Sequence, residues 1–499
     1  MVDSFALNAQ SLSYDDVQPI FESRCVSCHS EKQIGPIPLT TFEEVQAYAQ
    51  MIRYVIDIDY MPPFLISDSH HALNNDRRLS LKEKNKIISW IDSGINEGEK
   101  NVVSKPKNIS LMKADMAFEM QDSFEQYGVY YDQYRSFIIP TNNKRDTFIS
   151  AIQFAPGNHD IVRGASISVV TDTSNIARWD KWDPNYGYFS FGDIGDVPFE
   201  SRWYNWSPGQ VATMYPSDEY KFLPKDAFLV FHIHYGPTSY RQRDKSQLLI
   251  KYGDKSSRRR VVQPLVHAGN YSKEIDLFHA DEVVNVHASF TLDTDIKLYG
   301  LMPHGHFLCR EWSIFIKDDQ NNAEPLIDIN DWDFKWRQMF SFEEPLTIKK
   351  GSAIHVLAKF DNTNKNLLNP SDPPASVTWG KRMFEEMMMV YLDYTSIDSK
   401  SSDFRLAVNP TLVHRPIQTY SFFLSESRNI RLSIKNCEKI NETIDLPLKK
   451  YSKGWNSFDL ELTELPFGNY HLQFFDDDGV LLDHQIIAYL NERYFGLFN

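Results

Sequence analysis

The chain has few cysteines, no long hydrophobic run and no excess of basic charge. No stretch approaches the roughly 18 consecutive apolar residues that a membrane span needs, so we expect none. The formal net charge of −15 argues against nucleic acid as a partner, because such affinity depends on Lys and Arg neutralising phosphates. The one marked basic run, Arg258 to Arg260, is interpreted as a solvated hairpin turn.

The first residues also lack a basic segment followed by an apolar one, which is the pattern of an export signal. Either the chain has no such signal or the signal has been removed. The haem motif described below favours removal.

A chain of 499 residues exceeds what one hydrophobic core serves, and 42% hydrophobic residues supply material for several cores. Helix-start patterns at Ser13, Thr41 and Ser80 predict a small all-α unit at the N-terminus. Short apolar-polar alternations follow it and predict β-sandwiches. We therefore expect four domains: an α domain at 1–105, β-sandwiches at 106–265 and 266–398, and an immunoglobulin-like β-sandwich at 399–499.

Two of the four cysteines fall in Cys25-Val26-Ser27-Cys28-His29, which has the C-x-x-C-H spacing of covalent c-type haem attachment. Both thiols can form thioethers with the haem while the histidine binds the iron. A redox pair would be expected in a βαβ context, and a zinc site would need a second ligand pair; neither pattern is visible. We therefore predict haem c at Cys25, Cys28 and His29.

A second iron ligand is expected on the opposite haem face. Met61 is the best candidate, because the prolines that follow it fix a loop that can hold a thioether in place. His70 and His71 are the alternatives. Met51 shares a helical pattern with apolar residues and is interpreted as core.

The segments Cys25 to His29, Thr41-Phe42, Met61 to Pro63 and Trp90 to Gly94 resemble the cytochrome c domain that precedes bacterial copper type II monooxygenase domains. The resemblance continues through Pro303-His304-Gly305-His306 and Glu385-Glu386-Met387. These segments are similar to the catalytic domain of that family, which includes peptidylglycine α-hydroxylating monooxygenase and dopamine β-monooxygenase. The resemblance implies a jelly-roll-like fold for both central sandwiches and a location outside the bacterial cytoplasm.

The resemblance also implies a copper site at His304, His306 and Met387. On a strand, the H-x-H spacing places both imidazoles on one face. Imidazoles bind both copper oxidation states and a thioether favours Cu(I), the form that meets O₂. Taken without the resemblance, Met387 would be interpreted as a core residue, since other methionines surround it.

Relatives bind a second copper through a His-His pair and a further histidine. His234 is present here, but the pair is replaced at Val162-Arg163-Gly164. We expect that one copper remains and that the haem supplies the missing electron. The alternative is a second site rebuilt from His232 and His234 with His159 or His267.

The sequence thus predicts a periplasmic or exported bacterial oxidoreductase that hydroxylates a C–H bond of an organic substrate with O₂ and takes electrons from an external donor. The alternative is a non-catalytic electron-transfer or copper-binding and sensing protein. Cys309 and Cys437 are expected to be buried thiols rather than a disulfide.

Overall fold

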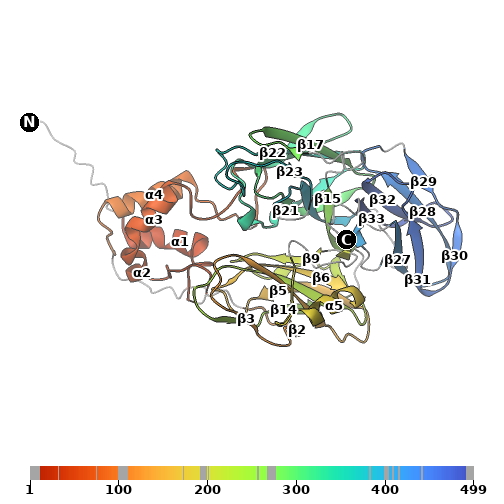
Figure 1. The fold of residues 1–499 in the computed structure, drawn as a ribbon, viewed down its shortest axis with the longest axis horizontal. Coiled ribbons are helices and arrows are strands. Elements are labelled where there is room, and N and C mark those ends of the chain that lie inside the picture. The colour runs from red at the N-terminus through yellow and green to blue at the C-terminus, as the bar shows by residue number, and fades with distance from the viewer. Residues whose placement is uncertain are drawn as a thin grey trace, which may run out of the picture.

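The computed structural model describes residues 12–31, 33–74, 76–98, 111–171, 173–190, 199–200, 202–254, 258–266, 277–380, 384–397, 404–406, 410–413, 416–439 and 442–490. Strands dominate from residue 116 onward and form several antiparallel sheets, with a helical unit at one end (Figure 1). The prediction of a β-rich, multidomain chain is confirmed.

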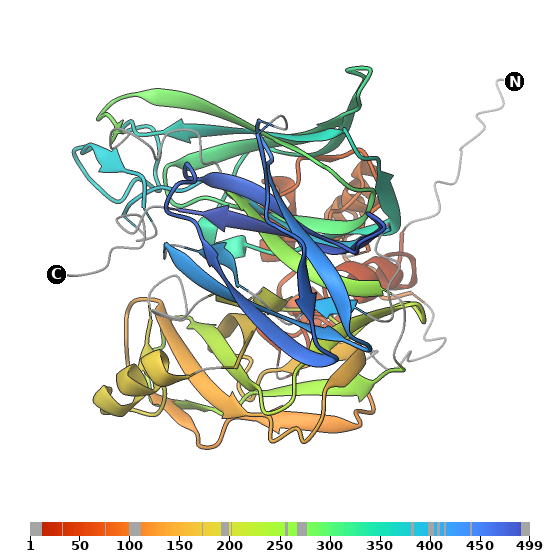
Figure 2. The same ribbon diagram turned by 90° about the vertical axis from the view of Figure 1, so that its right-hand side faces the viewer.

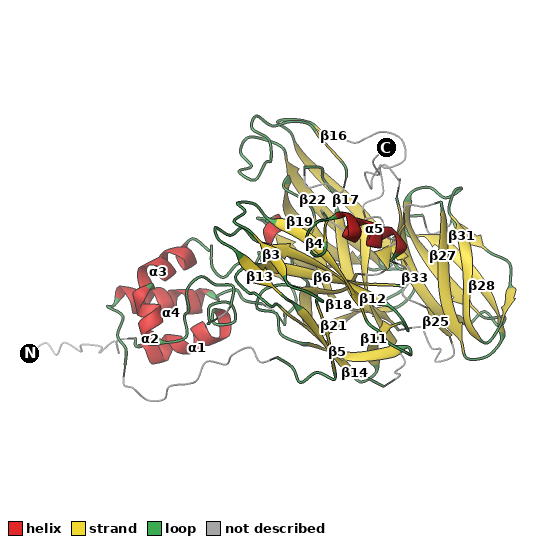
Figure 3. Cartoon of the chain, turned by 60° about the horizontal axis from the view of Figure 1, so that its bottom comes forward, coloured by secondary structure: helices red, strands yellow, loops and turns green. Residues whose placement is uncertain are grey.

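The helical unit contains α1 (Tyr14–Arg24), α2 (Phe42–Ala47), α3 (Ala49–Asp57) and α4 (Leu81–Asp92). Ser13 is the N-cap of α1, and the capping boxes of α2 and α4 begin at Thr41 and Ser80, as the sequence predicts. Each box satisfies backbone N–H groups that the first helical turn leaves without partners. The helices bury one apolar cluster and lie apart from the sheets at one end of the molecule (Figure 3).

The N-terminal unit is not purely helical, which corrects the all-α prediction. Between α3 and α4 the chain forms β1 (Asp68–Ser69), which pairs with β20 (Ala323–Ile329), and Leu73 forms a bridge with Phe342. These backbone hydrogen bonds are made to two strands far along the chain, so local sequence patterns gave no sign of them. They attach the helical unit to the second sandwich.

The first sandwich buries one core between two sheets. One sheet contains, in order, β2 (Met116–Glu119), β14 (Gln247–Tyr252), β5 (Thr147–Ala155) and β11 (Glu219–Leu223), with β10 (Thr213–Met214) beside β5. The other contains β7 (Tyr188–Phe189), β4 (Gln133–Pro140), β12 (Phe228–Tyr235), β6 (Val162–Val170) and β9 (Arg202–Trp206). Smaller elements are β3 (Phe124–Gln126), β13 (Gln242–Asp244) and α5 (Ser174–Trp182).

The second sandwich also has two sheets around one large core. One sheet contains β15 (Arg258–Val266), β24 (Met389–Ser396), β18 (Ile296–His304) and β21 (Phe340–Ile348). The other contains β20, β19 (Cys309–Lys317), β22 (Ala353–Asp361) and β17 (Val283–Thr291). Smaller elements are β16 (Leu277–Phe278), β23 (Val377–Thr378) and the 3-10 helix η1 (Phe334–Trp336).

Strand β15 joins the two sandwiches. It pairs in parallel with β11 on one side and antiparallel with β24 on the other. The prediction that Arg258 to Arg260 form a solvated turn is therefore wrong. Arg260 is buried and makes a bidentate ion pair with Asp393, with 2.8 Å between Nε and Oδ1 and 2.8 Å between Nη2 and Oδ2. A buried guanidinium needs such a carboxylate partner.

The C-terminal unit, drawn in blue, packs its own core between two sheets (Figure 2). One sheet contains β25 (Phe404–Leu406), β27 (Ile417–Leu424) and β31 (Gly454–Glu461). The other contains β29 (Thr443–Asp445), β28 (Arg428–Asn436), β32 (Gly468–Phe475), β33 (Leu481–Tyr489), β26 (Pro410–Val413) and β8 (Phe199–Glu200), with β30 (Lys449–Tyr451) beside β28.

Within the described ranges, no helix is long and apolar enough to cross a membrane, as predicted. Cys309 and Cys437 are both buried thiols, which agrees with the sequence interpretation.

Candidate metal centres

The haem motif forms a tight helical turn directly after α1. The backbone N–H groups of Cys28 and His29 both donate to the Cys25 carbonyl, at 3.0 and 2.9 Å. Burial raises the pKa of Cys25 to about 12. The turn therefore holds both sulfurs and the imidazole within one short segment.

The orientation of His29 suits an iron ligand. Its Nδ1 lies 2.9 Å from the Ile37 carbonyl oxygen, which can only accept, so Nδ1 carries the proton and Nε2 keeps its lone pair. Gly35 packs directly on this ring, where a Cβ atom would lie 2.5 Å from Nδ1. These residues fit a covalently attached haem.

Of the predicted sixth ligands, Met61 lies half buried after α3, and its N–H donates to the Val55 carbonyl (3.1 Å). Its role as an iron ligand stays a prediction. The alternatives face the second sandwich instead. His70 Nε2 lies 2.9 Å from an Asp328 carboxylate oxygen, and the His71 ring packs edge-on against Phe342.

The candidate copper histidines flank a glycine at the end of β18. His304 is 5% exposed and His306 2% exposed, with ring centroids 5.5 Å apart. A Cβ at Gly305 would lie 2.9 Å from the Cβ of Cys309, so only glycine fits here. Trp332 donates from Nε1 to the Gly305 carbonyl (3.2 Å), which fixes the turn between the histidines.

One buried carboxylate links this turn to the segment containing Met387. Oε2 of Glu386 accepts from the N–H of His306 (3.0 Å) and of Met387 (3.2 Å), and Oε1 accepts from Leu308 N–H (2.7 Å). Burial raises the pKa of Glu386 to about 8, while these donors lower it. Sequence reasoning quoted Glu386 within a motif but gave it no role, because its partners lie some 80 positions upstream.

His306 is ready to bind a metal. Its Nδ1 lies 2.7 Å from the Glu385 carbonyl oxygen, so Nδ1 carries the proton and Nε2 keeps its lone pair. Nδ1 of His304 instead lies 3.3 Å from Nη1 of Arg337, which can only donate. A metal on either nitrogen of His304 therefore requires Arg337 to give up this contact. Once Arg337 has moved away from His304, the two imidazoles and the Met387 thioether are a donor set that fits copper.

Apolar side chains surround the pair of histidines. The Phe334 ring lies 5.4 Å from that of His306 and 6.0 Å from that of His304, and Tyr391 lies 6.3 Å from His304, all between centroids. Met387 is 5% exposed and packs in a small cluster with other methionines. The surroundings are compatible with both a metal-bound and a core thioether.

One ring nitrogen of each histidine in the possible second site contacts a protein group. Nε2 of His234 lies 2.9 Å from an Asp132 carboxylate oxygen, and Nδ1 of His232 lies 3.0 Å from Oγ of Ser136. Burial lowers the pKa of His234, with Arg337 and Arg163 acting in the same direction and Asp132 opposing them. His234 is therefore neutral at neutral pH.

Arg163 lies at the position where the sequence resemblance predicts a His-His pair. Its side chain lies against Gly236, where a Cβ would be 2.5 Å from its Nε, and Asp132 and Asp160 balance its charge. A guanidinium next to His234 repels a metal ion. Asp132, which completes this arrangement, was also missed by sequence reasoning, because nothing local distinguishes it.

In the parts of the chain that the structure describes, no group of three or more His, Cys, Asp or Glu side chains could hold a metal ion. This finding covers His159 but says nothing about a site that includes methionine. His267, the other histidine considered for a rebuilt second site, lies outside the described residues.

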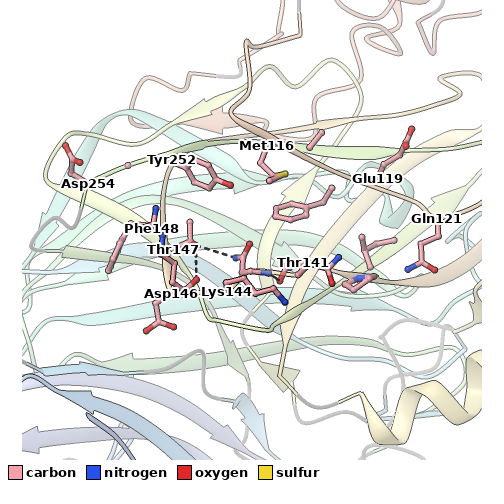
Figure 4. A pocket seen from close by; sticks show the side chains of 18 residues that line it. Met116, Glu119, Gln121, Thr141, Lys144, Asp146, Thr147, Phe148, Tyr252 and Asp254 are labelled. Atoms are coloured by element: carbon pink, nitrogen blue, oxygen red, sulfur yellow. Dashed lines mark hydrogen bonds between the residues drawn. The ribbon is translucent and has the colours of Figure 1, made fainter. Parts of the chain in front are cut away.

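A broad open pocket of about 1090 Å³ lies on the first sandwich, away from these histidines (Figure 4). Met116, Lys144, Asp146 and Tyr252 are among its lining residues. None of the predicted metal ligands lines it, so it is not the candidate site.

Comparisons with known proteins identify no family: no family model matches the chain, and neither does any curated protein. Similar solved structures include a Ruminococcus gnavus β-glucuronidase (TM-score 0.14, 10% identity, 46% of this chain and 44% of that one). A DUF4785 family protein from Legionella pneumophila has TM-score 0.14 and 10% identity, over 75% of this chain and 92% of that one. The infectious bursal disease virus VP2 particle has TM-score 0.16 and 10% identity, over 57% and 73%.

The chain thus spans less than half the length of that β-glucuronidase. At such TM-scores the similarity carries no argument about fold or function. The functional argument has to come from the sites themselves.

Proposed function

We propose that this chain is a copper-dependent monooxygenase of the copper type II class that hydroxylates a C–H bond of an organic substrate with O₂. The fused haem c would supply electrons from an external donor to a mononuclear copper site. The N-terminal unit would be a cytochrome c domain and the central sandwiches the jelly-roll-like halves of the monooxygenase. The proposal also places the protein in the periplasm or outside a bacterial cell.

The observation that carries this proposal is the convergence on Glu386. One carboxylate oxygen accepts the backbone N–H of both His306 and Met387, so a buried side chain connects the two distant segments that carry the predicted ligands. His304 stands two residues away on the same turn. A buried acceptor such as the Glu386 carboxylate can orient metal ligands without itself binding the metal.

Copper held there would supply O₂ activation at an open coordination position. The protein's contribution is orientation and exclusion of water. Glu385 and Glu386 fix His306, Trp332 fixes the turn, and the Phe334 and Tyr391 rings limit solvent access.

A single copper is favoured because the guanidinium of Arg163 lies beside His234 and repels a second metal ion. His234 donates to Asp132, and Arg163 places a positive charge beside it. The second electron then has to come from elsewhere, and the haem motif is the candidate source.

The C-terminal unit is proposed to be an immunoglobulin-like module. Tyr470 donates its hydroxyl to the Pro466 carbonyl four residues upstream (2.6 Å), as in the tyrosine corner of such sandwiches.

Metal analysis of the purified protein tests the proposal, and we expect one copper and one haem per chain. Met387→Ala should leave the haem spectrum intact and abolish O₂ consumption coupled to product. Two coppers per haem would contradict the mononuclear site, and unchanged turnover in the variant would refute Met387 as a ligand.

The second candidate is a non-catalytic electron-transfer or copper-binding protein. The contact between Arg337 and His304 favours the electron-transfer protein, because that contact has to open before a metal binds. Anaerobic reduction followed by admission of air separates the candidates. A monooxygenase reoxidises its copper with O₂, whereas an electron carrier stays reduced until it meets its protein partner.

A further inference from the structure

The haem motif touches the first sandwich near the residual second site. Arg77 lies 3.9 Å from Sγ of Cys28 through Nη1, and its Nη2 donates to the Pro208 carbonyl at 2.7 Å. A Cβ on Gly209 would lie 3.0 Å from the same sulfur. One of the two sulfurs that would carry the haem therefore lies on the loop Ser207–Gly209.

This loop follows β9, which is separated from the strand of His234 by β6. Trp206, the last residue of β9, pairs with Ala165 of β6, and the neighbouring Gly164 pairs with His234 of β12. The path from the loop thus crosses two adjacent strands. Figure 1 shows the helical unit at one end of the molecule.

Tyr134 continues the path from His234 towards the candidate copper site. Its ring stacks on that of His234, with centroids 4.5 Å apart and planes 10° from parallel. Its hydroxyl is hydrogen bonded to Arg337, whose Nη1 lies 3.3 Å from His304. Tyr134 belongs to the first sandwich and Arg337 to the second, so this pair bridges them.

We propose that electrons pass from the haem through the Ser207–Gly209 loop and His234, cross between the sandwiches at Tyr134 and Arg337, and reach His306 through the Phe334 ring, whose centroid lies 4.1 Å from the Arg337 guanidinium and 5.4 Å from that of the His306 ring. The inference rests on the proposed function and specifies its electron route. In the step, ferrous haem becomes ferric and Cu(II) becomes Cu(I), with one electron moved and no bond or proton exchanged. His234 thus takes part in electron transfer without binding a metal.

Arg337 has two separable effects in this arrangement. A metal at His304 displaces only its contact with Nδ1, whereas its contacts with Tyr134 and with the Phe334 ring (4.1 Å to the centroid) do not involve that nitrogen. Replacing Arg337 should therefore ease copper binding, since a competing positive charge is removed, and at the same time slow electron arrival. If Arg337 had only a structural role, its replacement would not tighten copper binding while slowing electron transfer.

The test uses full-length protein with haem and Cu(II) loaded. A light pulse with a small photoreductant delivers one electron to the ferric haem, and the haem absorbance then records its departure to copper; copper-free protein should keep the electron at the haem. Copper content, haem potential and thermal stability are measured for each variant.

We expect Tyr134→Phe and Arg337→Met to slow the copper-dependent phase by an order of magnitude or more, with Arg337→Met binding copper more tightly. Tyr235→Phe is the matched control. It removes a buried hydroxyl that donates to Asp244 (2.7 Å) from the opposite face of β12, and should keep the wild-type rate.

Wild-type rates in both variants, with copper bound, would overturn the route alone. Wild-type protein that binds copper but shows no copper-dependent phase would overturn haem as the electron source, and with it the route. Protein that binds no copper at all would overturn the proposed function as well.

Discussion

Glu386→Gln tests whether a buried carboxylate organises the candidate copper site. In the native protein its two oxygens accept the backbone N–H groups of His306, Leu308 and Met387, and the backbone N–H of Cys309 also bonds to it. The side chain is 1% exposed, so no water replaces a lost acceptor. Glutamine has the same shape but only one acceptor oxygen.

The amide has two orientations. With its oxygen at the Oε2 position, it still serves His306 and Met387 but turns its NH₂ towards the Leu308 N–H; the reverse orientation leaves both predicted ligands without an acceptor. At least one buried donor is unpaired, which costs about 1–3 kcal/mol of unfolding free energy. Copper affinity should fall roughly 10- to 100-fold, as for other outer partners of metal ligands.

The assay is competition for Cu(I) between the protein and a chromophoric chelator, at a pH of about 9, above the Glu386 pKa of about 8, so that the carboxylate is the reference state. Glu385→Gln is the control, because His306 bonds to the Glu385 backbone carbonyl, which the substitution keeps. The haem spectrum should be unchanged in both. Wild-type copper affinity and stability in Glu386→Gln would refute the reasoning.

Two further predictions concern stability. Burial, with His471 and Arg259 contributing, lowers the pKa of His484 from 6.5 to about 3, so the folded protein excludes a proton that the unfolded chain takes up below pH 6.5. The contribution of neutral His484 to the free energy of unfolding is therefore fully present above pH 6.5 and is lost as the pH falls towards 3. Between pH 7 and pH 5 the free energy of unfolding should fall by about 2 kcal/mol less in His484→Gln than in the native protein, as measured by denaturant titrations. Arg260→Leu should destabilise the protein by about 3–5 kcal/mol because it leaves Asp393 buried without its partner, and wild-type denaturation midpoints would contradict this.

Local patterns in the sequence determined the elements. The capping boxes at Thr41 and Ser80 begin helices, and the apolar-polar alternation from Ala165 to Val169 is part of β6, since both signals depend on neighbours a few positions apart. The haem motif is equally local, because its two thiols and imidazole share one turn.

Tertiary structure decided everything that joins distant segments. The sequence predicted His304 and His306 on one face of a strand, whereas β18 ends at His304 and His306 lies beyond it. Glu386, Arg337 and Asp132 acquire their roles through contacts with residues 33 or more positions away. Periodicity carries no information about such pairs. The positive charge of the Arg258 to Arg260 run can be predicted from the sequence. The burial of Arg260 against Asp393 cannot, because it depends on which strands pair with β15.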